Sequence, residues 1–300
     1  MANSLRKVAI VGASGHLGPF ILKALQQSQD FAITVITRKN SSAVFPSDTR
    51  VVRVTDGYPD DEMIEVFRGH DAVILSLGFA AENRHGALAR ASIKAGVKRL
   101  VASGYGVDAT NKEAAKVFPV AATKAAMLED LKSLETSGGR GRIFPAACIQ
   151  VGFFGIDPAK KTASIWDDGN ARFTATTRDA IGKSVVGVLR HPDETANRIM
   201  HISSTELSMN ELLAAEQKVS GEDGWQVSHV NTEEEIAKAQ NTLATQTEFM
   251  PKMNAVGRLG LAVNMKDSFG ANFKALGLLD NESLEVPQES LEDVVRRVRE

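Results

Sequence analysis

The sequence predicts an α/β protein built on a doubly wound parallel sheet, followed by a smaller C-terminal α+β lobe. Three observations support this prediction. In the first half of the chain, short apolar runs alternate with segments of helical periodicity, which is the pattern of βαβ units. A glycine-rich turn directly follows the first apolar run, and beyond Gly152 the alternation loosens. The predicted strands are 7–11, 32–37, 50–54, 71–77 and 99–103.

Each of these strands is mostly apolar at consecutive positions, as expected for strands that helices cover on both faces. The connections are long enough for crossover helices except between residues 37 and 50, where we expect a single irregular turn. A helix follows the glycines, because Leu17, Ile21 and Leu25 recur at helical spacing. Further predicted elements are helices at 83–97 and 123–139, each ending at glycine, and a sixth strand at 142–149.

The second half is predicted to contain a β-hairpin at 163–177 that turns at Asp168-Gly169-Asn170. The other predicted elements are a helix at 178–192, a seventh strand at 198–203, a strand at 225–230 and a final helix at 288–300. The simplest organisation is a domain of residues 1–155, to which the segment 178–204 returns a strand, and a lobe formed mainly by residues 156–300.

Composition narrows the class of protein. The 35 basic and 37 acidic residues give a net charge of -2, which argues against nucleic acid and anionic membranes as partners. The single cysteine, Cys148, excludes an internal disulfide and is expected to be a buried, inert thiol rather than a nucleophile. No segment reaches the roughly 20 apolar residues of a membrane span. We therefore expect a soluble cytoplasmic protein, a monomer or homodimer, without a metal site.

The glycine-rich turn has the spacing Gly12-x-x-Gly15-x-x-Gly18 and includes Ser14, His16 and Leu17. In a dinucleotide fingerprint, glycines allow the tight turn from strand to helix and let the backbone approach a pyrophosphate at the helix N-terminus. The spacing differs from GxGxxG by one residue, and glycines also serve ordinary tight turns. Its place between the first predicted strand and helix favours a Rossmann-type dinucleotide site.

The end of the second predicted strand indicates which dinucleotide binds. An acidic residue at this place binds the ribose 2′-OH of NAD, whereas arginine accommodates the 2′-phosphate of NADP. The sequence has Arg38 and Lys39 there, and no carboxylate follows before Asp48. The alternative is a solvated pair of cations at a strand tip. The pattern favours NADPH/NADP+ over the NAD(H) pair.

Catalytic groups are expected at the carboxyl ends of the strands, where open α/β sheets bind their ligands. Lys124, at the start of a predicted helix, is a candidate to orient the cofactor and donate a proton, although its spacing alone also suits a surface lysine. A Tyr-x-x-x-Lys pair is absent, because Val120 precedes Lys124 by four residues. Tyr105 follows the fifth strand and either faces the site or packs on the sheet edge. The proton donor is left open between Lys124, Tyr105 and water.

Together these motifs resemble the NmrA-like and isoflavone reductase-like atypical short-chain dehydrogenases, especially forms of fungal secondary metabolism. The resemblance covers most of the chain. The segments that carry it are VAIVGASGHLG, TRKN, GHDAVILSLG, IKAGVKRLVASGYGVD, FPVAATKAAMLEDL, PAACIQVGFFG and FTATTRDAIGKSVVGVL.

The resemblance implies that NADPH binds through the Gly12 to Gly18 loop and Arg38, and that Lys124 takes the position of the family's active-site lysine. The adenine end would lie near Asp56 to Tyr58, and the nicotinamide near Leu77, Gly78 and Phe79, near Ser103 and Gly104, and near the loop after the sixth strand. Plant reductases of the group usually show Ser-Glu-Phe-Gly where this chain has Ser103-Gly104-Tyr105-Gly106. This departure weakens any transfer of their substrate specificity to this sequence.

The leading hypothesis is an NADPH-dependent reductase that transfers hydride to a conjugated carbonyl, an imine or a related aromatic metabolite. The candidate pocket residues are Phe153, Phe154, Trp166, Phe249 and Met250, each of which also suits a protein core. The rival hypothesis is a non-catalytic NADP(H)-sensing regulator that acts through a protein partner. The presence of Lys124 favours the enzyme, because such regulators often lack that lysine. A third possibility is a relic of the fold that binds no nucleotide.

Overall fold

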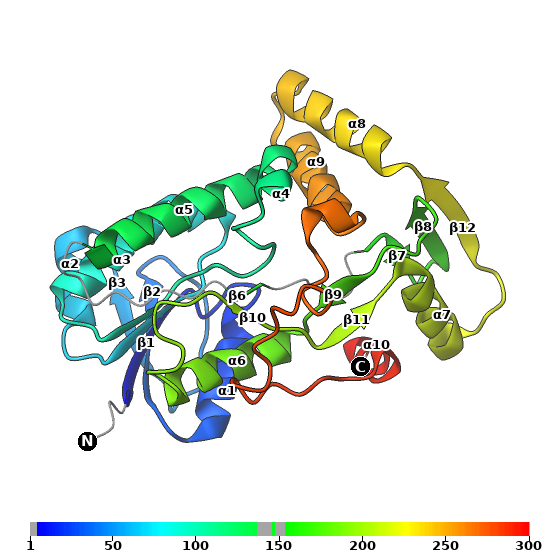
Figure 1. Cartoon of the computed structure of the whole chain (residues 1–300). Helices are drawn as coiled ribbons and strands as arrows, with labels where there is room; N and C mark the ends of the chain where they lie inside the picture. Colours follow the sequence, from blue (N-terminus) through cyan, green and yellow to red (C-terminus); the bar gives the residue numbers. More distant parts are fainter. Residues whose placement is uncertain (1–4, 137–145, 148–153, 300) are drawn as a thin grey trace.

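The computed structural model describes residues 5–136, 146–147 and 154–299. Its largest sheet has five parallel strands in the order β3-β2-β1-β4-β5 (Figure 1). The strands are β1 (Lys7–Val11), β2 (Ala32–Arg38), β3 (Arg50–Val54), β4 (Ala72–Leu75) and β5 (Arg99–Val101). The chain starts in the middle and builds outward first on one side and then on the other. The switch point of this doubly wound sheet therefore lies between β1 and β4.

Helices cover both faces of the sheet, as consecutive apolar positions in its strands require (Figure 1). Val8 and Ile10 of β1 face α1 (Gly18–Ser28) and α6 (Arg178–Arg190). Ala9 and Val11 face the opposite layer. That layer consists of α2 (Asp60–Phe67), α3 (His85–Lys94) and α5 (Pro119–Thr136). The predicted α/β fold class is confirmed.

Local signals in the sequence mark some of the helix ends. The Thr177 hydroxyl accepts a hydrogen bond from the Ala180 N–H and so begins α6, and α3 is followed by Gly96 at a φ of 79°. Residues 39–49 form turns without a helix, as predicted. The helix predicted at 123–139 begins earlier, at Pro119, and its terminal glycines lie outside the described residues. Two short elements complete this half, η1 (Phe79–Arg84) and α4 (Lys112–Val117).

The predicted sixth and seventh strands meet as a parallel pair, β6 (Ala146–Ala147) and β10 (Met200–His201). The rest of the predicted 142–149 strand, including Cys148, lies outside the described residues. In the C-terminal half, β7 (Ile156–Asp157), β8 (Thr162–Trp166) and β12 (Gln226–Val230) form one sheet in the order β12-β8-β7. β9 (Phe173–Ala175) and β11 (Thr205–Leu207) form another.

The predicted hairpin at 163–177 is wrong. Its two strands, β8 and β9, belong to different sheets, although the turn between them exists. The Asn210 side chain donates hydrogen bonds to the Asp168 carbonyl and to Asn170 Oδ1, and the Asn210 N–H donates to the Gly169 carbonyl. The turn is therefore held by α7 (Met209–Ser220), a helix more distant in sequence than α6, and the strands also pair with partners distant in sequence.

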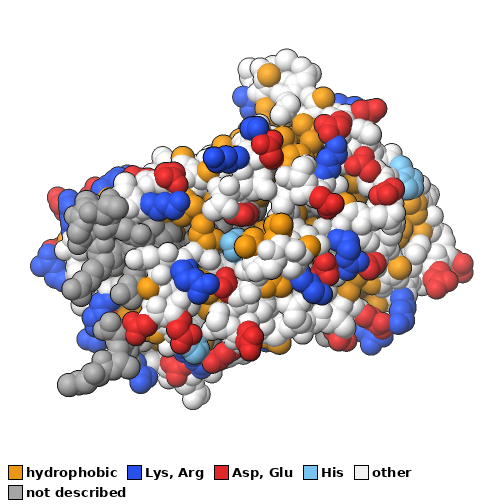
Figure 2. All heavy atoms as spheres, in the orientation of Figure 1, with side chains coloured by type: hydrophobic (Ala, Val, Ile, Leu, Met, Phe, Trp, Pro, Cys, Tyr) orange, Lys and Arg blue, Asp and Glu red, His pale blue; other side chains and the backbone are white. Residues whose placement is uncertain are grey.

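The C-terminal lobe contains helices that the sequence pattern did not locate. They are α7 (Met209–Ser220), α8 (Thr232–Thr245), α9 (Phe249–Ala262) and η2 (Asp267–Phe269), whereas the predicted final helix is α10 (Leu291–Arg299). α8 and α9 pack together and project from the molecule (Figure 1). Figure 2 shows basic and acidic side chains interspersed over one face of the protein. No described helix is long and apolar enough to cross a membrane.

Candidate active site

The glycine loop makes a turn with no room for side chains at two of its positions. Gly12 has a φ of 87°, and a Cβ atom there would lie 2.2 Å from the Ser76 carbonyl oxygen on the neighbouring strand. A Cβ at Gly18 would lie 2.2 Å from the Gly12 carbonyl oxygen. Gly15, whose N–H donates to that same carbonyl, has its nearest Cβ contact at 3.4 Å. Gly12 and Gly18 are thus required by packing, while a Cβ at Gly15 would make only ordinary van der Waals contacts.

The loop leads into the N-terminus of α1. Leu17 is the N-cap residue and provides no side-chain hydrogen bond, and the first turn of the helix contains no acidic residue. The helix therefore presents uncapped N–H groups and the positive end of its dipole. Gly12, Ser14 and Gly15 line one wall of a cleft of about 450 Å³, whereas His16 is exposed beside it and Leu17 packs against the core.

Arg38, at the end of β2, lines the same cleft. Its guanidinium is exposed and makes no hydrogen bond or ion pair within the described part of the chain. The neighbouring Lys39 directs its ammonium to the Thr55 hydroxyl, 3.5 Å away. Arg38 is thus a cation without a carboxylate partner among the described residues, which suits an incoming phosphate.

Tyr58 forms the next part of the wall and has the left-handed φ of 54°, directly after Gly57 at 87°. Burial raises the pKa of the Tyr58 hydroxyl, and the charge of Arg38 opposes that shift while the charge of Asp56 adds to it. Asp56 does not line the cleft, because its carboxylate accepts from the Asn40 N–H and amide at 3.3 and 3.2 Å.

Arg84 is a cleft residue that sequence reasoning missed. Its Nη2 donates to the Tyr58 carbonyl at 2.6 Å and lies 3.3 Å from Asp60 Oδ1, which holds the left-handed turn in place. Its Nε is buried without a hydrogen bond among the described residues. A buried donor of this kind at a cleft wall is commonly satisfied by a ligand or water. One feature of the sequence could have pointed to Arg84. It is a basic residue that follows the fourth strand, which is one of the two strands at the switch point of the sheet.

The ends of β4 and β5 are joined beside this cleft. The Ser103 hydroxyl donates to the Leu77 carbonyl at 3.1 Å, and Leu77 and Gly78 line the cleft. Lys124 on α5 is 8% exposed, and its ammonium donates to the Tyr105 carbonyl. Its burial excludes the interpretation of Lys124 as a surface lysine. Gly104 lies in the same turn, where its N–H donates to the Ala102 carbonyl, while Phe79 begins η1 after β4.

The aromatic residues proposed for a substrate pocket do not gather around one described cavity. Phe154 packs on Phe173 with ring centroids 4.8 Å apart, and Trp166 lies under the Arg258 guanidinium at 4.6 Å. Both are fully buried in the core of the C-terminal lobe. Phe249 and Met250, at the start of α9, are 70% and 63% exposed, and Phe153 lies outside the described residues.

Comparison with known proteins identifies the group to which this architecture belongs. A model of the NmrA-like family matches residues 4–276. The chain belongs to the NmrA-like family. Among NmrA-like relatives, oxidoreductase aprR of Aspergillus flavus is 31% identical over 297 residues, covering 97% of this chain and 98% of the relative. Oxidoreductase poxI of Penicillium oxalicum is 33% identical over 242 residues, covering 78% and 76%. The predicted family is confirmed, and the predicted oxidoreductase class agrees with these names.

Solved structures share the NmrA-like fold over nearly the whole chain. A structure of isoflavone reductase superposes with a TM-score of 0.76 at 17% identity and covers 98% of this chain and 100% of its own. AtPrR2 with NADP+ and (+)pinoresinol gives a TM-score of 0.78 at 16% identity, with 99% of each chain covered. The lobe after residue 155 is therefore part of the same fold as in these proteins.

Proposed function

We propose that this NmrA-like protein is an NADPH-dependent reductase of a small aromatic or conjugated metabolite. The observation that carries the proposal is the buried Lys124, whose ammonium is held at the strand-end turn beside the glycine-loop cleft. Residues 1–155 would hold the cofactor, and residues 156–300 would mainly hold the substrate. Of the candidate pocket residues, Phe154 and Trp166 are buried in the core of the lobe, whereas Phe249 and Met250 are exposed and accessible to a substrate.

The described residues fit NADP(H). Gly12 and Gly18 allow the close backbone packing that shapes the turn, and Ser14, Gly15 and the uncapped N-terminus of α1 suit the pyrophosphate. Arg38 suits the 2′-phosphate, because its guanidinium makes no ion pair within the described residues. Tyr58, in the wall next to it, and Arg84, with its buried unsatisfied Nε, would hold the adenosine side. The similarity of the fold to that of AtPrR2 with NADP+ supports this assignment.

When bound, NADPH supplies the hydride. The Lys124 ammonium would stabilise the negative charge that develops on the substrate and, directly or through a water molecule, would protonate it. The Tyr105 carbonyl orients that ammonium, so Tyr105 contributes through its backbone, and its ring is buried. A conjugated carbonyl or an imine is the substrate chemistry in which such a cation matters most. The pinoresinol of the AtPrR2 structure supports an aromatic substrate.

The test compares Lys124→Met with Lys132→Met, which changes an exposed lysine on the same helix. Loss of NADPH absorbance is followed with a panel of enones, ketones and imines. We expect Lys124→Met to lower kcat at least about 100-fold while NADPH affinity stays within about 3-fold. Undiminished turnover in Lys124→Met would contradict the proposal. Tight binding of both redox forms with no turnover by the wild type would favour the NADP(H)-sensing regulator instead.

A further inference from the structure

A buried histidine and a buried aspartate meet at the loop whose Tyr105 carbonyl accepts the hydrogen bond of Lys124. His201, at the end of β10, has its Nε2 3.8 Å from Oδ1 of Asp108, on the loop after β5, and both side chains are 10% exposed. The Nε2 is buried and makes no hydrogen bond with any described residue. Burying an imidazole nitrogen without a hydrogen-bond partner costs free energy, so this arrangement calls for an explanation.

Asp108 is prepared to carry a negative charge. Its Oδ1 accepts from the Thr110 N–H at 2.8 Å and from the Thr110 hydroxyl at 2.8 Å. Burial raises the pKa of the Asp108 carboxyl, but His201 and the two Thr110 donors outweigh burial, and the pKa is lowered. The Asp108 carboxylate is therefore ionised, and it faces the His201 ring in a place with little solvent screening.

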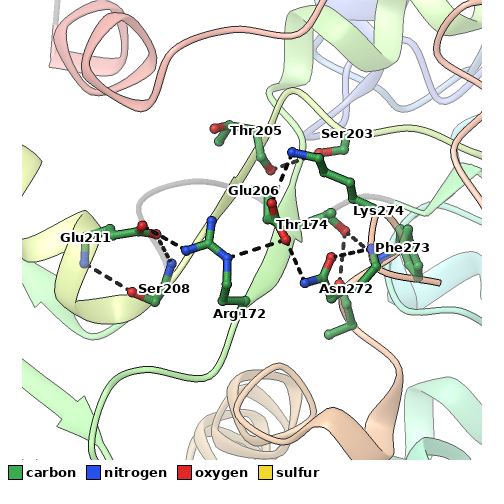
Figure 3. A network of polar contacts seen from close by, with 12 residues as sticks. Arg172, Thr174, Ser203, Thr205, Glu206, Ser208, Glu211, Asn272, Phe273 and Lys274 are labelled. Atoms are coloured by element: carbon green, nitrogen blue, oxygen red, sulfur yellow. Dashed lines mark hydrogen bonds and ion pairs between the residues drawn. The ribbon is translucent and has the colours of Figure 1, made fainter. Parts of the chain in front are cut away.

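Phe273, from the C-terminal lobe, packs against the histidine of this pair. The Phe273 ring meets the His201 ring edge-on, with centroids 4.9 Å apart. Figure 3 shows how Phe273 is held: both of its neighbours bind Glu206, Asn272 through its amide at 2.8 Å and Lys274 through its ammonium at 3.2 Å. The Phe273 N–H also faces the Thr174 hydroxyl at 3.4 Å. The position of the His201 ring is thus fixed from the lobe side.

The Asp108–His201 pair is connected to Lys124 through the loop that contains both Tyr105 and Asp108. Asp108 follows Tyr105 by three residues, and the Tyr105 carbonyl accepts the hydrogen bond of the Lys124 ammonium. A shift of the loop at Asp108 would therefore change the acceptor that orients Lys124. We propose that the Asp108–His201 pair is a positioning device that holds the loop 103–108 and, through Tyr105, sets the orientation and exposure of the Lys124 ammonium.

The proposal rests on the proposed function, in which Lys124 acts on the substrate. It makes the exposure of the Lys124 ammonium depend on the contact between His201 and Asp108, whose Nε2 and Oδ1 lie 3.8 Å apart. Among the described residues, Asp280 also contacts His201: it accepts from the His201 N–H at 2.9 Å and is itself paired with Arg198 at 2.8 Å. Asp280 binds the backbone, so Asp108 is the acidic group that faces the ring.

The experiment measures acylation of Lys124 by acetic anhydride in the full chain, by peptide mass spectrometry from about pH 5.5 to about pH 8.5. The rate is expressed as a ratio to that of the exposed Lys183. His201→Gln keeps a hydrogen-bond donor and removes the charge. The matched control is His191→Gln, which removes a histidine 3.3 Å from Glu285, a carboxylate outside the candidate site. NADPH titration of the same samples tests the proposed function separately.

We expect a low ratio in the wild type across this pH range, because the Asp108–His201 pair keeps the Lys124 ammonium at the Tyr105 carbonyl. His201→Gln should show the higher ratio at every pH, at least about 3-fold above the wild type near pH 6, and His191→Gln should match the wild type. Equal ratios in His201→Gln and the wild type would overturn the proposal. If near-ultraviolet circular dichroism shows that His201→Gln is unfolded, Asp108→Asn decides, because it removes the charged partner of the His201 ring and should raise the ratio in the same way. An unchanged ratio in Asp108→Asn also overturns the proposal.

Discussion

Substitutions at two glycines of the loop should separate effects on folding from effects on cofactor binding. Gly12 and Gly15 lie in the same turn and line the same cleft, yet a methyl group added to each would meet different surroundings. At Gly12 it would lie 2.2 Å from the Ser76 carbonyl oxygen, with the backbone at a φ of 87°. At Gly15 the nearest atom would be 3.4 Å away, and the φ is not left-handed. Gly12→Ala should therefore damage the fold, and Gly15→Ala should damage the site.

The expected magnitudes follow from these contacts. Placing alanine in the left-handed region costs about 1–2 kcal/mol, and relieving the overlap with a strand backbone costs a further 1–3 kcal/mol or so. Gly12→Ala should thus lower the free energy of unfolding by about 2–5 kcal/mol. Gly15→Ala should change it by less than about 1 kcal/mol. It should weaken NADPH binding about 10–100-fold, because the methyl group would keep a phosphate from the backbone N–H groups.

Urea unfolding of both variants gives the stabilities, and fluorescence titration gives the dissociation constants for NADPH. A Gly15→Ala protein that is as unstable as Gly12→Ala would refute the argument from the Cβ contacts. A stable Gly15→Ala protein with wild-type NADPH affinity would refute the assignment of the loop as the pyrophosphate site.

Two further variants test two charged side chains, Arg38, which has no ion-pair partner among the described residues, and Glu206, which is paired with Arg172 and Lys274. Arg38→Ala should weaken NADPH binding about 10-fold or more and leave NADH binding within about 2-fold, as measured by calorimetry; equal losses for both would contradict a 2′-phosphate contact. Glu206→Gln should lower the free energy of unfolding at pH 7 by about 1–2 kcal/mol. Hydrogen bonding by Asn272 and the cations beside it lower the Glu206 pKa from 4.5 to about 2, so this stabilisation is complete above the unfolded value and is lost as the pH falls toward 2. The gap between wild type and Glu206→Gln in urea unfolding should therefore close at acidic pH, and a gap that stays constant would count against the network in Figure 3.

The central sheet was predictable because its signals are local. Consecutive apolar residues mark strands covered on both faces, and the glycines mark the turn at β1 whatever else the chain does. The same is true of Arg38, since the end of a strand places its residue at the edge of the sheet. The sequence alone was therefore enough to predict these parts of the candidate cofactor site.

The C-terminal lobe was harder to predict because its pairings are distant in sequence. A turn at Asp168 to Asn170 suggested a hairpin, but the preceding strand pairs with residues 226–230 and the following one with residues 205–207. Hydropathy did not separate the buried Trp166 from the exposed Phe249. Arg84 was missed because its task depends on the Tyr58 carbonyl, which only the folded chain brings to it.

The most direct test of the account is the affinity of the wild-type protein for the two reduced nicotinamide dinucleotides. The cleft between the glycine loop, Arg38 and Arg84 predicts that NADPH binds at least about 10-fold more tightly than NADH, because only the former carries the 2′-phosphate that Arg38 can reach. Calorimetric titration at fixed ionic strength measures both constants. Equal affinities, or no binding of either at millimolar concentration, would contradict the claim that this cleft is an NADP(H) site.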